Sequence, residues 1–588
     1  MHPNDPLRRI LHIDLTRRSF EVEERPTLFE DDLGGSGAGI RLLDEFCPVG
    51  ADPLSPENPI VFAVGPLVGL YPMASKTVAM FKSPHTGNLG ESHAGGRSAA
   101  SIRMAGYGAV VIRGLSSSPV YLVIEDGKVS FRDASALWGL RSSYTVGRVL
   151  RDRESGSGHR SILRIGPAGE RQVSYACVIT ETYRHFGRLG LGAVFGSKRL
   201  KAIVIIGRRN LPVVEPKRYR ETYDVVHQAA TRSDAMRKYH DLGTPLNVLP
   251  LNELGALPTR NLTSGRFEAA EQVSGEAMAK RFLGRRLACT HCPVACIHLA
   301  ALRTPHPDEP YFYKTSMLGY DFEPIYALGS MLGISDPEGM LRLMDEVEIQ
   351  GLDAMSAGVV LAWATEAYNR KLLRFEDLEE IELAWGRADA YIEAVRRIVS
   401  QPTDLYRALA RGVDHASEVY GGDSFALAFG GNEMPGYHTG PGCHLGFLTG
   451  ARHSHLDSAG YSLDQRATAE GRKPSAEELI DALRREEQWR QILSSLVVCF
   501  FARGVYTLPI VRDALASVGI EKSEDRLTAD GAGILHRKNA FKVREGFDVS
   551  SFRIPERICE TPSPAGVLSD AFLRNALQVA DDRMNTSD

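Results

Sequence analysis

The sequence is poor in cysteine, has no excess of one charge and contains no long apolar run. Eight cysteines in 588 residues are too few for the disulfide framework of a secreted protein of this length. Lys and Arg number 69 against 73 Asp and Glu, so no overall basic charge points to nucleic acid. No segment approaches the roughly 20 apolar residues of a membrane helix, and the amino terminus lacks the apolar core of a secretory signal. We therefore expect a cytoplasmic protein with no membrane span.

The length and the hydrophobic pattern predict several domains. At roughly 150 residues per domain, the chain should contain about three or four. Up to residue 210 short apolar runs alternate with Gly and Pro, which is typical of strands, and beyond about residue 215 the apolar residues recur at helical spacing. We predict an α+β protein with a β-rich domain over residues 1–210, followed by two mostly helical domains over residues 211–420 and 421–588.

Two hairpins give the clearest local signals. Residues 10–15 and 19–23 are short strand-like runs joined by three polar residues. Residues 120–125 and 128–131 flank Asp126-Gly127, a pair typical of a two-residue hairpin turn. Both hairpins belong to the part of the chain that we predict to be β-rich.

Other segments are interpreted by their spacing. Helical periodicity is clear over residues 340–349, 359–368 and 477–493. The glycine-rich run from Gly34 to Gly39 is similar to a dinucleotide-binding loop, but no buried strand precedes it, so we predict a tight loop. The proline-rich residues 304–310 are also predicted to form a loop.

Three of the cysteines form a compact motif, Cys289-x-x-Cys292-x-x-x-Cys296. Clustered cysteines in a chain without an export signal indicate metal or redox chemistry, and soft thiolates suit an iron–sulfur cluster or zinc. A second Cys-x-x-Cys pair, usual in zinc sites, is absent, although the neighbouring histidines at 291 and 298 keep zinc possible. Cys499, far along the chain, is a candidate fourth ligand. Structural roles are the default for three isolated cysteines, Cys47, Cys177 and Cys559.

Two glycine-rich segments combine exposed backbone amides with basic side chains. They are His93-Ala-Gly-Gly-Arg97 and Arg184-His-Phe-Gly-Arg-Leu-Gly-Leu-Gly192. Backbone N–H groups beside a cation suit phosphate. Taken alone, either segment is as readily a turn or a packing site.

A set of segments from near the amino terminus to beyond Cys499 can be read together with the cysteine motif. They include Asp52-Pro-Leu-Ser-Pro-Glu-Asn-Pro, Lys82-Ser-Pro-His-Thr-Gly, Ala105-Gly-Tyr, Ile165-Gly-Pro-Ala-Gly-Glu, Gly192-Ala-Val-Phe-Gly-Ser-Lys-Arg-Leu-Lys-Ala-Ile and Ser274-Gly-Glu-Ala-Met-Ala. In this order, these segments and the cysteine motif resemble the aldehyde ferredoxin oxidoreductase family of tungsten–pterin enzymes.

The resemblance implies both cofactors and fold. A tungsten or molybdenum ion would be held by two pyranopterins, with Mg²⁺ bridging the pterin phosphates and a 4Fe–4S cluster as electron relay. The β-rich domain would form the base for the pterins and the helical domains would cap it. Cys289, Cys292, Cys296 and Cys499 would be the cluster ligands. This agrees with the chemistry, because a two-electron centre needs a one-electron outlet.

The family's cofactor contacts carry over with several departures. The positions concerned are Lys76, His93, Gly95, Gly96, Arg184, His185, Gly187, Arg188, Glu348, Leu352, Asp353, Arg452, Ser494 and Val498. Lys76 replaces an expected Arg and loses its bidentate fork, and His93 replaces an Asn. Glu348 and Ser494 stand where the family has Asp, and Val497 stands where it has Gly. A hydroxyl cannot fully replace a carboxylate that accepts hydrogen bonds from a pterin.

The resemblance also points to catalytic groups. Glu323 matches the family's active-site Glu and could activate water or accept a proton. The family's catalytic His falls on Leu456 here, so His455 or His453 is expected to supply that function from a shifted position. His444 and the adjacent Cys443 are expected to line the cavity.

We therefore expect an oxidoreductase that interconverts an aldehyde and a carboxylic acid, with ferredoxin or an iron–sulfur subunit as electron partner. The bridging-iron pair of some family members is replaced by Arg342 and Asp345, so no such iron is expected, although a homodimer remains possible. Two alternatives stay open at this point. One is the catalytic subunit of an aromatic acyl-CoA reductase, and the other is a zinc- or cluster-only scaffold without pterins.

Overall fold

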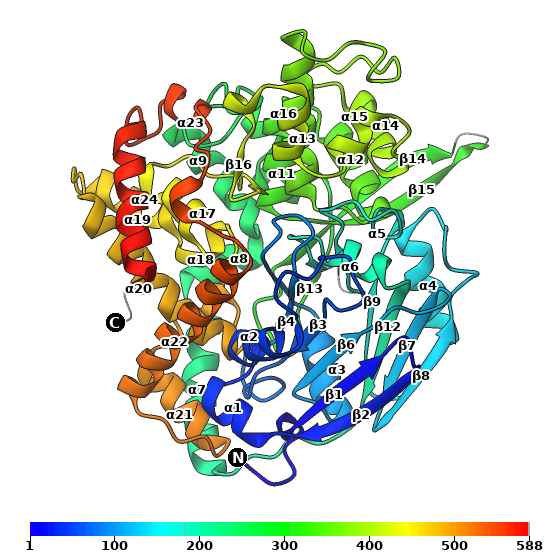
Figure 1. Ribbon diagram of the computed structural model, residues 1–588, viewed down its shortest axis with the longest axis vertical. Helices are drawn as coiled ribbons and strands as arrows, with labels where there is room; N and C mark the ends of the chain where they lie inside the picture. The colour runs from blue at the N-terminus through cyan, green and yellow to red at the C-terminus, as the bar shows by residue number, and fades with distance from the viewer. Residues whose placement is uncertain (182, 307–308, 586–588) are drawn as a thin grey trace.

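The computed structural model describes residues 1–181, 183–306 and 309–585. Figure 1 shows the amino-terminal residues as sheets at the lower right, with helices of the middle of the chain above them and helices of the last part along the left. The prediction of an α+β fold with a β-rich amino-terminal part followed by helical regions is confirmed. The predicted boundary between the two helical domains at residue 420 stays a prediction.

The first sheet has six strands in the order β2-β1-β6-β3-β4-β5. The strands are β1 Arg9–Asp14, β2 Ser19–Glu24, β3 Ile60–Ala63, β4 Thr77–Lys82, β5 Leu89–Ala94 and β6 Ala109–Arg113. β1 and β2 form the first predicted hairpin, with Asp14 opposite Ser19. Helix α2 (Gly35–Phe46) packs on β3 and β4, and every residue of β4 is buried. β5 ends beside the first glycine-rich segment.

The second sheet also has six strands, in the order β11-β10-β9-β12-β7-β8. The strands are β7 Val120–Glu125, β8 Lys128–Asp133, β9 His159–Arg164, β10 Val178–Ile179, β11 His185–Phe186 and β12 Leu200–Gly207. Asp126 and Gly127 both have positive φ (29° and 87°), as a two-residue hairpin turn requires, so the second predicted hairpin is confirmed. Pairing of Ile179 with His185 places the second glycine-rich segment at the sheet edge.

A third, antiparallel sheet was not expected. It consists of β13 Leu283–Leu287, β14 Ile297–His306 and β15 Glu309–Tyr320, and the cysteine motif lies between its first two strands. The predicted loop over residues 304–310 is wrong for Thr304–His306, which end β14, and for residues 309–310, which begin β15, while residues 307–308 lie outside the described part. Pro305 is accommodated because it lies opposite Tyr313 near the tip, where a register shift interrupts the ladder. A two-stranded sheet follows, β16 Ala428–Phe429 and β17 Asn432–Glu433.

Helices make up most of the remainder. Before residue 210 they are α1 Pro26–Asp32, α2, α3 Ser98–Ala105, α4 Ser143–Arg153, α5 Pro167–Glu170 and α6 Leu191–Ser197. Those up to residue 420 are α7 Pro216–Arg232, α8 Asp234–Asp241, α9 Val248–Leu254, α10 Gly275–Arg281, α11 Phe322–Leu328, α12 Pro337–Gln350, α13 Ala354–Asn369, α14 Ala388–Ser400, α15 Asp404–Leu409 and α16 Val413–Tyr420. The last are α17 Pro441–Thr449, α18 His455–Ser458, α19 Gly460–Ala469, α20 Ala476–Ser495, α21 Leu508–Ser517, α22 Glu524–Arg544, α23 Arg557–Glu560 and α24 Asp570–Asn585. The three predicted helical segments lie in α12, α13 and α20.

The glycine-rich run that we predicted as a tight loop instead begins α2. A methyl group on Gly35 would lie 2.2 Å from the carbonyl oxygen of Ser494, and one on Gly37 would lie 2.1 Å from that of Asp32. Gly35 therefore allows the start of α2 to approach the end of α20 at backbone distance, and Gly37 allows it to approach the end of α1. The prediction of a loop was wrong because these positions need glycine for close packing, where a side chain would not fit, and not for the formation of a turn.

One hydrophobic core lies mainly in the amino-terminal sheets, and a second runs through both predicted helical domains. A third core is smaller and includes Tyr71, Met73 and Val498, with Cys292, Cys296 and Cys499 packed against it. Among the described residues, no helix has the length and apolar character needed to cross a bilayer.

Candidate active site

The four cysteines of the predicted cage come from two loops that meet at the backbone of Met73. Cys289, Cys292 and Cys296 lie in the loop between β13 and β14, and Cys499 lies just after α20. Met73 N donates to a carbonyl oxygen of the motif loop (3.1 Å), and Cys499 N donates to the carbonyl oxygen of Met73 (2.9 Å). The structure thus brings the distant fourth cysteine to the other three, as predicted from the resemblance.

The thiols of this cage influence one another electrostatically. Burial raises the pKa of Cys292 to about 12, and the nearby Cys289 and Cys499 contribute to the rise. Burial also raises the pKa of Cys296, against the opposing effect of the Arg184 guanidinium. Thiols in such surroundings ionise only where positive charge compensates them, as iron would do. Among the described residues, no three His, Cys, Asp or Glu side chains form a group that could hold a single metal ion.

The first glycine-rich segment lies directly against the cage. Thr290 N donates to the carbonyl oxygen of Gly96 (2.9 Å), and a methyl group on Gly95 would lie 2.9 Å from Cys289 Sγ. Gly96 has φ of 103°, a conformation that favours glycine. The backbone of this segment can therefore approach both the cage and any group bound beside it.

Arg184 joins the cage to the candidate catalytic helix. Its Nη1 pairs with Asp321 Oδ2, and Asp321 precedes the first residue of α11. Burial alone would lower the pKa of Arg184, but Asp321 and the neighbouring thiols raise it above its ordinary value. This arginine therefore stays charged between the cage and Glu323, which is the second residue of α11.

Two ion pairs lie where the resemblance implies pterin contacts. His185 Nε2 lies 2.7 Å from Glu348 Oε2, and Arg188 Nε donates to Asp353 Oδ2 (3.2 Å). The backbone of Leu352 forms a β-bridge with that of residue 176, which holds this turn beside the second glycine-rich segment. Among the described residues, a methyl group on Gly187 would have one neighbouring atom within 4 Å, at 3.9 Å, so these residues leave space beside the segment.

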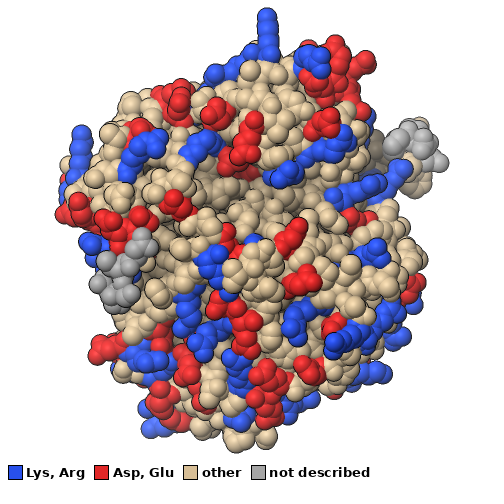
Figure 2. All heavy atoms as spheres, viewed as in Figure 1, with Lys and Arg blue, Asp and Glu red and all other residues tan. Residues whose placement is uncertain are grey.

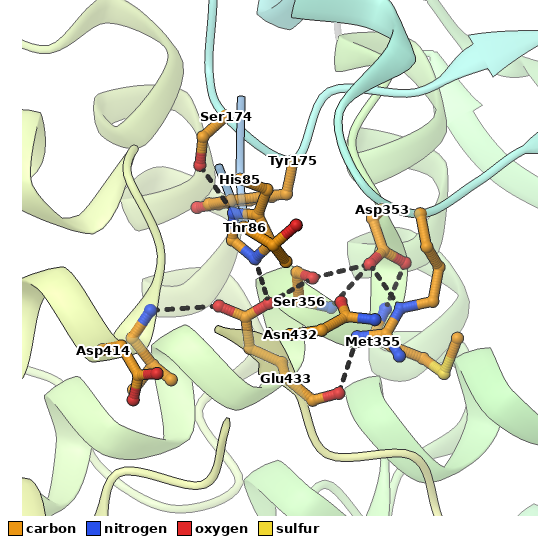
Figure 3. Close-up of polar contacts among 12 residues, drawn as sticks. His85, Thr86, Ser174, Tyr175, Asp353, Met355, Ser356, Asp414, Asn432 and Glu433 are labelled. Atoms are coloured by element: carbon orange, nitrogen blue, oxygen red, sulfur yellow. Dashed lines mark hydrogen bonds and ion pairs between the residues drawn. The ribbon is translucent and has the colours of Figure 1, made fainter. Parts of the chain in front are cut away.

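Figure 3 shows further side chains around Asp353 that the sequence analysis did not single out. Glu433 Oε2 accepts hydrogen bonds from His85 Nε2 (2.7 Å) and Ser356 Oγ (2.6 Å), and its Oε1 accepts one from the amide of Val413 (3.0 Å). Burial disfavours the charged form of Glu433, but His85 and Ser356 outweigh it and hold its pKa at about 2. His85 lies in a segment used only for the resemblance, and Glu433 lies in no recognised motif.

The implied contacts at the end of α20 also come together. Lys76 N donates to the carbonyl oxygen of Val497 (3.2 Å), and Val498 forms a β-bridge with Ala74. Ser494, in place of the expected Asp, is buried, and its carbonyl oxygen accepts a bond from the amide of Val497 (3.2 Å). The segment keeps its place beside Lys76 although its side chains depart from the family's.

His93 and Arg452 belong to a buried charged group. His93 Nε2 lies 2.7 Å from Glu91 Oε1, and Lys538 Nζ lies 2.5 Å from Glu91 Oε2. Burial and the charge of Arg452 lower the pKa of His93 to about 4, so its ring is neutral at pH 7. Arg452 itself donates from Nε to Asp457 Oδ1 (2.6 Å).

The candidate catalytic pair is formed by Glu323 and His455. Glu323 Oε1 lies 3.1 Å from His455 Nε2 and accepts a longer bond from the Tyr437 hydroxyl (3.4 Å). The Glu323 side chain keeps 18% of its surface exposed, and that of His455 keeps 6%. Burial would raise the pKa of Glu323, but the hydrogen bond and charge of His455 lower it overall. The pair is therefore an accessible carboxylate held by an imidazole.

The two other candidate histidines have different partners. His453 Nδ1 lies 2.9 Å from the carbonyl oxygen of Phe447, and its Nε2 lies 3.0 Å from Lys542 Nζ. His444 Nε2 lies 2.9 Å from His438 Nδ1. Of the three histidines proposed from the sequence, His455 is the one in contact with Glu323. The Cys443 thiol donates to the carbonyl oxygen of Tyr437 (3.4 Å), which places this cysteine against the backbone of the tyrosine that contacts Glu323.

The donor set fits a pterin and a cluster. Within the described part of the chain, several buried polar atoms of the site have no hydrogen-bond partner, namely Arg188 Nη1, Glu348 Oε1 and His455 Nδ1. Burying such atoms without a partner costs free energy, so they indicate a polar group that completes them. A flat heterocycle with N–H and C=O edges would do so at Arg188 and Glu348, and four thiolates suit an iron–sulfur cluster.

Two family sequence models account for most of the chain. The model described as aldehyde ferredoxin oxidoreductase, N-terminal domain, matches residues 10–207, and that for domains 2 and 3 matches residues 221–581. The chain belongs to the aldehyde ferredoxin oxidoreductase family. It is therefore an oxidoreductase of this family, as the sequence analysis predicted.

Individual relatives agree with this family. The tungsten-containing aldehyde ferredoxin oxidoreductase of Thermococcus kodakarensis is 32% identical over 95% of this chain and 92% of its own length. The aliphatic sulfonate oxidoreductase, WOR-like subunit, of Pyrococcus furiosus is 30% identical over 71% of this chain and 68% of its own. Among solved structures, the active site complex BamBC of benzoyl coenzyme A reductase with 1,5-dienoyl-CoA matches with a TM-score of 0.80 at 22% identity, over 95% of this chain and 93% of that chain. This last similarity shows the fold.

Proposed function

We propose that this family member is a tungsten- or molybdenum-bis-pyranopterin enzyme that interconverts an aldehyde and a carboxylic acid. The observation that carries the proposal is the Glu323–His455 pair, with the carboxylate partly exposed and the imidazole 3.1 Å away. Glu323 lies in the first turn of helix α11. Arg184 connects this helix to the cysteine cage through its ion pair with Asp321. A proton acceptor and an electron outlet therefore lie on connected elements.

In the direction of aldehyde oxidation, one water is consumed and two protons and two electrons are released. Glu323 accepts a proton from the water as its oxygen bonds to the carbonyl carbon. His455 Nε2 holds the carboxylate in place. The Tyr437 hydroxyl, 3.4 Å from Glu323 Oε1, limits how the carboxylate can turn. When bound, the metal–pterin group would accept the electron pair and the cluster would pass the electrons on singly.

The residues that would hold these groups are those assembled above. Arg188, Asp353, Glu348 and His185 would contact one pterin, and Lys76, Arg452 and the Ser494–Val498 segment the other, with Mg²⁺ between the phosphates. Cys289, Cys292, Cys296 and Cys499 would bind the 4Fe–4S cluster. Ferredoxin or an iron–sulfur subunit is the proposed electron partner, and the cytoplasm is the proposed location. A partner chain is supported by two similar proteins, one of which is named as a subunit and the other as a complex.

A second candidate is reduction of an aromatic acyl thioester. Its support is the similarity to the benzoyl coenzyme A reductase complex together with an aromatic wall beside the catalytic pair. The Tyr437 and Tyr461 rings stack with centroids 4.6 Å apart and an angle of 18°, and Tyr437 lies 5.1 Å from the His455 ring. Such a wall would contact a planar substrate favourably.

The deciding experiment combines metal analysis with paired assays. We expect anaerobically purified protein to contain about one tungsten or molybdenum and about four iron atoms per chain, and to reduce a viologen dye in the presence of aldehydes. Dye-dependent reduction of benzoyl-CoA without aldehyde oxidation would favour the second candidate. Protein that contains zinc alone, or iron without tungsten or molybdenum after reconstitution, would contradict both.

A further inference from the structure

His85, Ser356 and Glu433 form a buried group that the proposed reaction does not use. His85 lies in the loop between β4 and β5, Ser356 in the first turn of α13 and Glu433 at the end of β17. The side chains of His85 and Glu433 are 1% and 0% exposed. The group therefore joins three distant parts of the chain next to Asp353 (Figure 3). Asp353 in turn pairs with Arg188.

The number of protons in this group is limited. Ser356 Oγ lies 2.6 Å from Asp353 Oδ2 and 2.6 Å from Glu433 Oε2, and a hydroxyl has one proton to donate. If His85 donates to Glu433 Oε2, the Ser356 proton is free to point at Asp353. Without that donor, two carboxylates compete for one hydroxyl proton. His85 thus determines how firmly Asp353 is held.

Arg188 depends on the same group. Its Nε donates to Asp353 Oδ2 (3.2 Å) and its Nη2 donates to the carbonyl oxygen of Glu433 (2.6 Å). Its Nη1 is buried and has no partner among the described residues. Two of the three guanidinium nitrogens are therefore fixed by Asp353 and Glu433, and the third is free for a bound group.

The imidazole has little freedom to move. His85 Nδ1 lies 2.8 Å from Ser174 Oγ, so both ring nitrogens have partners. A methyl group on Gly412, where φ is 102°, would lie 2.5 Å from His85 Cε1 and 2.9 Å from Glu433 Oε1. The backbone at Gly412 therefore closes over the pair and keeps it in one arrangement.

We propose that His85 and Glu433 are positioning residues for the bound pterin. Acting through Ser356, they fix the Asp353 carboxylate and direct Arg188 Nη1 towards the cofactor. The inference rests on the proposed function, because it assumes that Arg188 and Asp353 contact a pterin.

The test measures cofactor retention rather than turnover. Wild type and variants would be purified anaerobically as holoenzyme, and the pterin lost during dialysis would be followed by its fluorescence after oxidative release. His85→Leu and Ser356→Ala should lose pterin about 10- to 100-fold faster than wild type, as is usual when a ligand's supporting partner is removed. His85→Gln, which can still donate to Glu433, should restore retention towards the wild-type rate.

A matched control is the His12–Glu23 pair, whose ring nitrogen and carboxylate oxygen are 2.9 Å apart on the β1–β2 hairpin. His12→Gln should leave pterin loss unchanged. If His85→Leu fails to fold, Ser356→Ala decides, since it removes only a hydroxyl. Wild-type protein with pterin, together with variants that lose it at the wild-type rate, would overturn the inference alone. Wild-type protein that never carries pterin would overturn the proposed function as well.

Discussion

Two buried His–Glu pairs in this molecule are alike in type and differ in their surroundings. His455 Nε2 lies 3.1 Å from Glu323 Oε1, and His85 Nε2 lies 2.7 Å from Glu433 Oε2. Glu323 has a second, longer contact with a tyrosine hydroxyl and keeps 18% of its side-chain surface exposed. Glu433 has both oxygens bonded and no exposed side-chain surface.

On the function proposed above, this difference separates a reactive carboxylate from a positioning one. A carboxylate has about four acceptor positions. Those of Glu433 are largely used by the protein, so this residue cannot approach a substrate. Among the described residues Glu323 has fewer partners, so a water molecule can donate a hydrogen bond to it. Residue type and pair geometry alone would not have distinguished the two roles.

The largest expected effect is on turnover. Glu323→Gln should lower kcat by about 10²- to 10⁴-fold, because the amide cannot accept the proton, while tungsten or molybdenum and iron contents stay at the wild-type level. Dye-coupled kinetics with metal analysis of the same preparation checks this. Wild-type kcat in a fully loaded variant would remove the catalytic role from Glu323.

The next effect is on folding. Glu433→Ala leaves the buried His85 Nε2 and the Val413 amide without their acceptor and should lower the free energy of unfolding by about 3–5 kcal/mol. The control is Glu23→Ala, which breaks the half-exposed pair with His12 and should cost at most about 1 kcal/mol. Urea unfolding of the three proteins at pH 7 makes the comparison. Equal losses of unfolding free energy in the two variants would contradict a larger contribution of Glu433 to the stability of the fold.

The pH dependence of that loss has a definite sign. The pKa of Glu433 is about 2 in the folded chain against an ordinary 4.5, so its carboxylate stabilises the fold fully above pH 4.5 and progressively less as the pH falls towards 2. The difference in unfolding free energy between wild type and Glu433→Gln should therefore be largest near neutral pH and shrink below pH 4.5. Unfolding curves from pH 7 to pH 3 would show this, and a constant difference would count against an ionised Glu433.

The smallest effect concerns the tyrosine beside the catalytic pair. Tyr437→Phe removes a 3.4 Å hydrogen bond to Glu323 and keeps the ring that stacks on Tyr461. At that length the bond is weak, so kcat should fall only about twofold. Steady-state kinetics at several pH values measures it. A loss as large as that of Glu323→Gln would instead make the Tyr437 hydroxyl a participant in proton transfer.

Local features of the fold could be predicted from the sequence because their causes are local. Asp126-Gly127 forms its hairpin turn by backbone preference alone, and the helical segments follow the spacing of their apolar side chains. The third sheet was missed because the prolines at its tip indicated a loop. Strands β14 and β15 form there because they are stabilised by each other. The glycines at the start of α2 were misread because their packing partner, the end of α20, lies more than 400 residues away.

The candidate site shows the same division. The cysteine motif and Glu323 could be found from residue type, spacing and resemblance. The His85–Glu433 pair could not, because the two residues are 348 positions apart, Glu433 lies in no recognised motif, and the segment around His85 supports the family resemblance without indicating a partner. The choice among His444, His453 and His455 was likewise open, since only the folded chain shows which imidazole touches the carboxylate.

The two cysteine loops that meet at Met73 also affect the stability of the folded chain. Cys296 and Cys499 are separated by about 200 residues, so a cluster bound by both would act as a cross-link closing a very long loop. Chain-entropy arguments assign about 5 kcal/mol to the conformations that such a closure removes from the unfolded ensemble. Stripping the iron would then release that constraint, so oxidative damage to the cluster would loosen the helical half of the molecule at the same time as it interrupts electron flow.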